Sequence, residues 1–225
     1  MIRLKITWRY CLAFYCIIML YSSLHELVHH FAGYLICGEW GIKTFNYFAT
    51  ACDEEAKSLI ATYAGPIFTF AMMYVGMYLL QKEKSAYHKH LGFALIFAQL
   101  PFQRMISPFF KMNDEFYASS LLFGNTTIVY WSVIISIWLI CLPPIIKAFQ
   151  VIGNKNKILW FLFYLTLFPY LLWGPFFGLF EYLMVEKKLL AQPIIGIGLL
   201  FIINEIVTIV GYYLTKKYIN PHSTQ

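Results

Sequence analysis

Residues 8–37 read WRYCLAFYCIIMLYSSLHELVHHFAGYLIC, an apolar run in which Arg9 and Glu26 are the only formally charged side chains. A helix of about 30 residues measures roughly 45 Å at 1.5 Å per residue, whereas the hydrocarbon core of a bilayer is about 30 Å thick. The run therefore predicts a helix that crosses a membrane and extends beyond the hydrocarbon. The polar residues of the HELVHH stretch lie nearer its later end.

Five more apolar blocks follow, and each reaches the ~20 residues that a helical span requires. They cover approximately 58–81, 91–110, 125–149, 157–181 and 189–215. Only 12% of the chain is charged and 60% is hydrophobic, whereas a soluble domain carries about 25% charged residues. We therefore expect an all-α polytopic membrane protein with about six transmembrane helices, forming a single integral membrane domain over residues 1–225.

The distribution of Lys and Arg predicts the orientation, because cytoplasmic loops are enriched in these residues. With the N-terminus inside, the inner segments hold Arg3, Lys5, Arg9, Lys82, Lys84, Lys89, Lys147, Lys155, Lys157, Lys216 and Lys217. The outer segments hold Lys43, Lys57, Arg104, Lys111, Lys187 and Lys188. Both termini are then expected on the cytoplasmic side. We expect a multi-pass protein of a bacterial plasma membrane.

The net charge of +6 does not indicate a nucleic-acid partner, because no Lys/Arg cluster is dense enough to follow a phosphate backbone. The five cysteines form no CxxC pair, and most of them lie in apolar blocks. We therefore expect small buried hydrophobic residues and no disulfide framework. The basic N-terminus before an apolar run is also typical of a signal peptide, but hydrophobicity continues to Cys37, which favours an uncleaved first span.

His25, Glu26 and His29 form the pattern His-Glu-x-x-His. Residues i and i+4 of a helix lie on one face, so both imidazoles can point at one metal ion. Glu26 is then placed to take a proton from a water at that metal. His30 points about 100° away and is expected to be a supporting or interfacial group. The alternative is a polar belt of histidines that faces lipid headgroups.

Catalytic zinc usually has three protein ligands, so a further donor is required. Asp114 is our predicted third ligand, with Glu115 as the substitute. The other aspartate belongs to the cluster Asp53-Glu54-Glu55, which we interpret as a solvated loop. In the alternative interpretation, Asn113 simply caps the next helix. Arg104 either stabilises charge near the metal or snorkels and pairs with Glu115.

These motifs resemble the site-2 proteases, a family of intramembrane zinc metallopeptidases. The resemblance rests on HELVHH in the first span, on Ala64-Gly65-Pro66 in the second and on an aspartate after the third. It covers roughly residues 8–120, which it marks as a catalytic three-helix core, with accessory helices over 125–215. It implies Zn²⁺ as the cofactor and a role for Gly65 and Pro66 in the approach of substrate.

The chain departs from the family pattern at several positions. Val28 replaces the glycine before the second histidine, the aspartate lies in Asn-Asp-Glu, and Phe68-Thr69-Phe70 stands where the family has an asparagine. Residues 42–48, which follow Gly41, resemble the extended segment of the family, and such a segment is expected here.

Three functions follow from the sequence. The first is an intramembrane zinc metalloprotease that cuts a membrane-anchored protein or peptide within the lipid bilayer. The second is a metal or proton transporter that uses His25, His29, Asp114 and the mid-span Glu205. The third is an inactive membrane scaffold that retains the metal site. Glu26 distinguishes them, because only hydrolysis requires it as a base.

Overall fold

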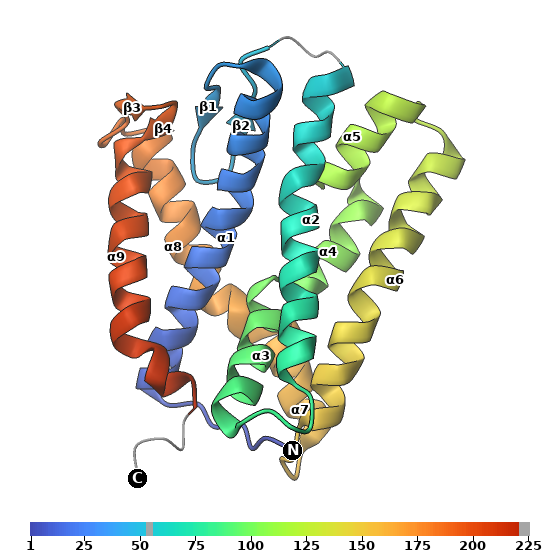
Figure 1. Cartoon of the computed structure of the whole chain (residues 1–225), viewed down its shortest axis with the longest axis vertical. Coiled ribbons are helices and arrows are strands. Elements are labelled where there is room, and N and C mark those ends of the chain that lie inside the picture. Colours follow the sequence, from blue (N-terminus) through green and yellow to red (C-terminus); the bar gives the residue numbers. More distant parts are fainter. Residues whose placement is uncertain (53–55, 221–225) are drawn as a thin grey trace.

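The computed structural model describes residues 1–52 and 56–220, so the Asp53-Glu54-Glu55 cluster lies outside the described residues. Its helices are α1 (Trp8–Cys37), α2 (Ala56–Leu79), α3 (Ala86–Ala98), α4 (Pro101–Ile106), α5 (Asp114–Phe123), α6 (Thr127–Val151), α7 (Lys157–Leu162), α8 (Phe168–Val185) and α9 (Leu199–Thr215). The short 3₁₀ segments η1 (Ser107–Phe110) and η3 (Lys216–Ile219) and the π-helical turn η2 (Phe163–Leu167) extend them. The N-terminus and η3, the last described element, lie at one end of the bundle and the strands lie at the other (Figure 1).

The expected all-α polytopic architecture is confirmed. Five helical segments are long and apolar enough to cross a membrane, namely Trp8–Cys37, Ser58–Leu79, Thr127–Val151, Lys157–Val185 and Leu199–Ile219. A sixth path between the two ends is made of α3, α4, η1 and α5 in succession (Figure 1). The sequence-based estimate of about six spans therefore counts one broken path as a continuous helix.

The break follows from local backbone chemistry. Leu100 adopts a left-handed conformation (φ 52°) and Pro101 opens α4. Proline has no N–H to continue the preceding helix and disfavours helical geometry in the residue before it. A second left-handed residue, Lys111 (φ 58°), ends η1. The expected helix over 91–110 is thus divided, and Asp114 becomes the first residue of a new helix, α5.

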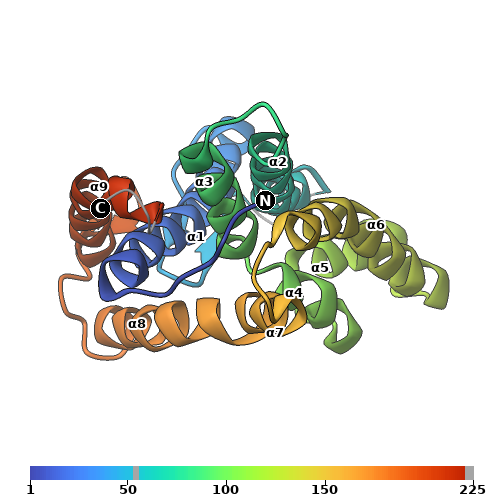
Figure 2. The ribbon, with the colours of Figure 1, turned by 90° about the horizontal axis from the view of Figure 1, so that it is seen from below.

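Helix α1 is defined by a cap at each end. The side chain of Thr7 accepts a hydrogen bond from the Tyr10 N–H, and Gly38 (φ 77°) donates its N–H to the Tyr34 carbonyl. Gly38 adopts the left-handed conformation with little steric cost and so ends the helix. In Figure 2, α1 lies inside the bundle, with α9 and α6 at opposite edges. The helix that carries the histidines therefore packs against α2, α3, α8 and α9.

A small sheet closes the end of the bundle that lies opposite the termini. Its strands are β1 (Ile42–Lys43), β2 (Phe48–Ala49), β3 (Pro193–Ile194) and β4 (Ile197–Gly198). Their order is β2-β1-β4-β3, with Ile42 opposite Ala49 and β1 parallel to β4. The extended segment expected over 42–48 is thus a hairpin, and a second hairpin from the sixth apolar block pairs with it. Strand β2 forms one edge of the sheet.

The prediction of no disulfide is wrong for two cysteines. Cys37, the last residue of α1, is bonded to Cys52, which follows β2, and their Cα atoms are 5.4 Å apart. This spacing suits a disulfide. The β1–β2 hairpin turns the chain back toward the end of α1, a proximity that residue spacing alone does not show. Cys16 and Cys141 are buried as expected, and Cys11 is half-buried.

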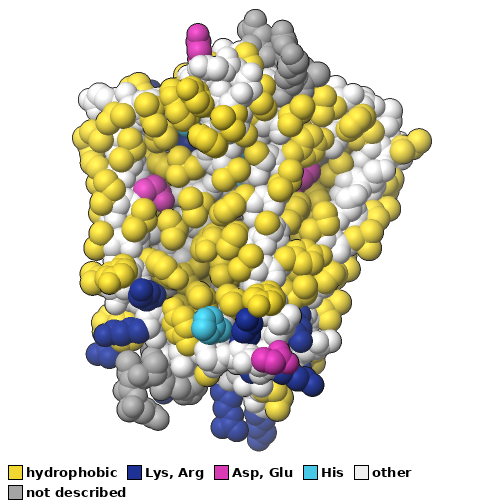
Figure 3. Space-filling model, in the orientation of Figure 1, with side chains coloured by type: hydrophobic (Ala, Val, Ile, Leu, Met, Phe, Trp, Pro, Cys, Tyr) yellow, Lys and Arg dark blue, Asp and Glu magenta, His cyan; other side chains and the backbone are white. Residues whose placement is uncertain are grey.

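The larger hydrophobic core fills the half of the bundle that is nearer the termini. Its aromatic centre packs in mutual ring contact and comprises Tyr10, Phe14, Phe93, Phe97, Tyr164 and Phe168. A smaller core around Phe45, Phe177 and Phe201 lies beneath the sheet. On the face shown in Figure 3, apolar side chains cover the middle of the molecule and Lys and Arg gather at the lower end.

Candidate metal centre

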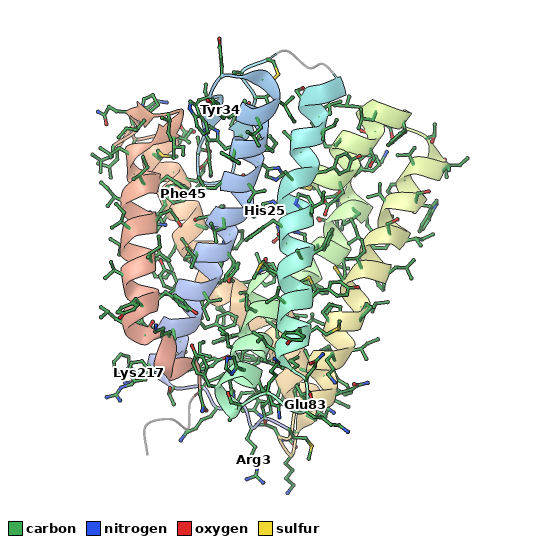
Figure 4. The ribbon with its side chains drawn as sticks, in the orientation of Figure 1. Arg3, His25, Tyr34, Phe45, Glu83 and Lys217 are labelled. Atoms are coloured by element: carbon green, nitrogen blue, oxygen red, sulfur yellow. A yellow bond between two sulfur atoms is a disulfide. The ribbon has the colours of Figure 1, made fainter. Side chains whose placement is uncertain are left out.

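His25 and His29 stand one turn apart on α1, and both are buried, with 6% and 0% of their surface exposed. Their Nε2 atoms are 3.1 Å apart and their ring planes are almost perpendicular. In Figure 4, His25 lies between α1 and α2 in the interior of the bundle. The helical spacing of the motif therefore directs both nitrogens at one point.

Asp114 is brought to the same point from α5. Its Oδ2 atom lies 3.3 Å from His25 Nε2 and 3.6 Å from His29 Nε2. The break at Lys111 and the extended backbone of Asn113 set the start of α5 beside α1. The structure thus brings the three predicted ligands together, and they are the one potential metal-binding group found among the described residues.

The distances among these three atoms fit zinc. Ligands bound 2.0–2.1 Å from zinc at tetrahedral angles lie about 3.3 Å from one another. The observed separations of 3.1, 3.3 and 3.6 Å bracket that value. Two imidazoles and a carboxylate are a donor set that zinc accepts. His25, His29 and Asp114 are therefore suited to hold a zinc ion through His25 Nε2, His29 Nε2 and Asp114 Oδ2.

The other nitrogen of each ring is held by α2. His25 Nδ1 lies 2.9 Å from the Thr69 hydroxyl, and His29 Nδ1 lies 2.9 Å from the Ala61 carbonyl oxygen. When Nδ1–H of His29 donates to that carbonyl, the Nε2 lone pair is free for a metal, as is usual for histidine ligands. Thr69 lies in the Phe68-Thr69-Phe70 stretch, which stands where the site-2 protease family has an asparagine, and the sequence did not indicate a role for it.

Gly65 gives the rings the space they occupy. A Cβ atom at this position would clash with His29 Nε2 and would lie 2.7 Å from His25 Cε1. Pro66, the next residue, lines a separate apolar cavity of about 490 Å³ between α2, α5 and α6. Gly65 therefore packs directly against both histidines, whereas Pro66 is buried on the side of α2 that faces α5 and α6.

Arg104 lies over the site. Its Nη2 atom is 2.9 Å from His25 Nε2 and 3.1 Å from Nδ1, and its Nη1 atom is 3.4 Å from Asp114 Oδ2. A nitrogen almost equidistant from both ring nitrogens lies over the ring face and not along a lone pair. The guanidinium therefore brings positive charge to the ligands without taking the position of a metal.

Glu115, the predicted substitute ligand, turns away from the histidines. Its Oε2 atom accepts a hydrogen bond from Asn113 Nδ2 at 2.6 Å, and its Oε1 atom is 3.8 Å from Arg104 Nη1. Asn113 occupies the N-cap position of α5, but its side chain makes no capping hydrogen bond. Asn113 and Glu115 thus support the start of α5 and the position of Arg104.

Glu26 shares a polar cavity of about 180 Å³ with His25 and Asp114. Gln99 Nε2 and Asn113 Oδ1 are buried polar atoms without a hydrogen-bond partner among the described residues, and both residues line this cavity. The cavity can therefore offer a bound molecule a proton acceptor, a hydrogen-bond donor and a hydrogen-bond acceptor.

The hairpin beside the candidate metal ligands is held by residues that the sequence did not indicate. Phe48 of β2 stacks on the His29 ring at 4.3 Å. Glu181 of α8 accepts hydrogen bonds from the Thr44 hydroxyl and the Phe45 N–H at 2.9 and 2.8 Å. These contacts fix the hairpin between α1 and α8, as Figure 4 shows for Phe45.

Lys43 is the most unusual charge in the hairpin, with 1% of its surface exposed. Its Nζ atom donates to the Thr44 carbonyl and lies 3.8 Å from the centre of the Phe201 ring. Burial lowers the pKa of Lys43 to about 8, although the carboxylates of Glu26, Glu205 and Glu181 oppose this effect. The residues on either side of Lys43 in the sequence do not indicate that it is buried.

Two other polar residues lie outside the ligand group. His30 Nε2 is 2.9 Å from the Ile195 carbonyl oxygen, and its ring stacks on Trp40, so it holds the second hairpin against α1. Glu205 accepts a hydrogen bond from Asn204 of the same helix, α9. Neither residue belongs to the group that can hold a metal among the described residues.

Searches against protein-family models, curated proteins and solved structures found no match to this chain. The interpretation of the site therefore rests on its own geometry.

Proposed function

We propose that this protein is an intramembrane zinc metallopeptidase that hydrolyses a peptide bond in a membrane-anchored protein or peptide. The observation that carries the proposal is the convergence of His25, Asp114 and His29 at separations that suit zinc. The glutamate of the same motif, Glu26, lines the adjoining cavity. This combination of three ligands and one neighbouring base is typical of hydrolytic zinc sites.

When zinc is bound, it polarises a carbonyl oxygen and lowers the pKa of water toward ~7. Glu26 serves as the general base that accepts a proton on its carboxylate from the attacking water and then delivers it to the leaving amine. Gln99 and Asn113 line the same cavity and orient the peptide through their unpaired polar atoms. The apolar packing around α1 limits the access of bulk water, so charges in the site are weakly screened.

Arg104 has two roles in this proposal. In the resting protein its guanidinium balances the carboxylates of Asp114 and Glu115. During hydrolysis the same charge stabilises the oxyanion that develops on the scissile carbonyl. The two sequence-based interpretations of Arg104, as an ion-pair partner and as a catalytic group, are therefore compatible, because Arg104 lies close to both Asp114 and Glu115.

A helical substrate must unwind before hydrolysis, because its carbonyls are occupied by hydrogen bonds within the helix. Strand β2 is an edge of the sheet, and an edge strand can pair with an extended peptide. Residues 47–50 and Asp114 line one cavity of about 340 Å³. A peptide paired with β2 would thus lie next to the ligand from α5.

The test is zinc content together with cleavage of a model membrane peptide by the purified protein. Glu26→Gln is expected to retain about one zinc per chain and to lose at least ~100-fold in cleavage rate, because a general base contributes 10²–10⁴-fold. Glu83→Gln is the matched control, because Glu83 is exposed at the end of the bundle that lies opposite the hairpins (Figure 4). This variant should cleave like wild type. The proposal would be contradicted if Glu26→Gln cleaved as fast as wild type, or if the purified wild-type protein contained no zinc.

A further inference from the structure

We infer that the metal centre is reached from the non-cytoplasmic side of the membrane, and that its substrates present the scissile segment on that side. The substrate half of this inference rests on the proposed function, whereas the orientation of the protein does not. Three separate observations support it: a disulfide, the distribution of charge and the position of the cavities.

The disulfide marks one end of the bundle. Cys37 and Cys52 are joined where α1 ends and the β1–β2 hairpin returns, which is the end opposite the N-terminus and η3 (Figure 1). Disulfides form and persist in oxidising compartments and are rare in the cytosol. The hairpin end is therefore assigned to the outer side of the membrane.

The basic side chains mark the other end. Those near the termini or in the turns beside them are Arg3, Lys5, Arg9, Lys82, Lys84, Lys89, Lys147, Lys155, Lys157, Lys216 and Lys217. Arg3 and Lys217 are labelled there in Figure 4. At the hairpin end, Lys187 and Lys188 are exposed, whereas Lys43 is buried and Arg104 belongs to the metal centre. Because loops rich in Lys and Arg stay in the cytoplasm, charge assigns the same orientation as the disulfide.

The cavities connect the metal centre to the disulfide end. Cys52 and Asp114 both line the cavity of about 340 Å³ between β2, α2 and α5. Toward the termini, the aromatic core containing Phe14, Phe97 and Tyr164 separates the histidines from the basic end. His25 lies 15 residues after Tyr10 in α1, so this packed region is about 22 Å deep. A peptide therefore reaches the ligands from the hairpin side.

The substrate class follows from this placement. An extended segment on the outer surface, either exported or next to a membrane anchor, reaches the edge of β2 without crossing the bilayer. A segment on the cytoplasmic surface would have to displace the aromatic core. The proposed peptidase is thus suited to polypeptides that have already been translocated.

Orientation is tested with a membrane-impermeant maleimide on intact cells that express the full chain. Lys187→Cys, exposed at the hairpin end, and Lys82→Cys, exposed at the basic end, form a matched pair. We expect labelling of Lys187→Cys in intact cells, and labelling of Lys82→Cys only after permeabilisation. In the wild type, Cys37 and Cys52 should become labelled only when an impermeant reductant is added outside.

The reverse pattern would overturn the inference: Lys82→Cys labelled in intact cells and Lys187→Cys only after permeabilisation, or Cys37 and Cys52 labelled only when a reductant reaches them from the cytoplasm. The reductant-dependent labelling of the wild type needs no substitution, so it decides the question even where a variant fails to fold. Neither readout measures cleavage. An inactive protein with the expected labelling would refute the proposed function alone, whereas an active protein with reversed labelling would refute this inference alone.

Discussion

Gly65→Ala is the most direct test of how the histidines are arranged. The new Cβ would clash with His29 Nε2 and would lie 2.7 Å from His25 Cε1. Carbon atoms in contact are normally at least about 3.5 Å apart, so the His25 ring must withdraw by about 0.8 Å. A metal–ligand distance tolerates a change of only about 0.2 Å. We therefore expect one imidazole to leave the ligand set.

The expected loss of zinc affinity is at least 10–100-fold, because changes in residues that merely orient a ligand already cost that much. The assay is competition of purified wild type and variant against a chelator of known affinity, with circular dichroism to confirm that both are helical. Gly178→Ala is the matched control, because a Cβ at this helical glycine meets no atom within 4 Å. Wild-type affinity in Gly65→Ala would refute the described packing of the two rings.

Three further predictions follow from the same contacts. Asp114→Asn should lose zinc by elemental analysis whereas Glu115→Gln should retain it, because only Asp114 lies within reach of both imidazoles; the opposite result would transfer the ligand role to Glu115. Lys43 releases its proton near pH 8 in the folded protein but only near 10.5 when unfolded, so stability relative to Lys43→Met should rise with pH between these values; a flat difference between their melting temperatures would contradict this. Cys52→Ser opens a loop with a sequence separation of 15 residues and should lower the free energy of unfolding by about 3 kcal/mol, measured by denaturant titration in detergent; an unchanged value would mean that the hairpin is held by its other contacts.

The sequence was sufficient for the parts of the molecule that depend on local spacing. Helical periodicity alone predicts that His25 and His29 share a face, and apolar length predicts the spans. The break at Leu100 and Pro101 also has a local signal, because a proline inside an apolar block marks the end of a helix. It was missed because the length of the whole block suited a single span.

Contacts across the bundle were beyond the reach of this reasoning. Thr69 and Ala61 orient the two rings from α2, and nothing in their own neighbourhood distinguishes them from other residues of an apolar helix. Glu181 binds a hairpin that precedes it by more than 130 residues. The Cys37–Cys52 bond depends on the same hairpin. Each of these contacts depends on which elements are neighbours in the fold. Periodicity describes the residues within one helix or strand, so a single sequence does not show which elements pack together.

The arrangement of polar and apolar residues along the bundle favours hydrolysis over transport. A transport route must link both membrane surfaces, and in the sequence it required Glu205 together with the metal ligands. In the structure, Glu205 is hydrogen-bonded to Asn204 on α9 and lies outside the ligand group among the described residues. The half of the bundle toward the basic end is filled by packed aromatic rings such as Phe14, Phe93 and Tyr164, which offer no carboxylate to relay a cation. The cavity beside β2 connects Asp114 to the hairpin end, and the aromatic core separates the histidines from the basic end. This placement suits a site that admits a peptide, adds water across its bond and releases both products to the side from which the peptide came.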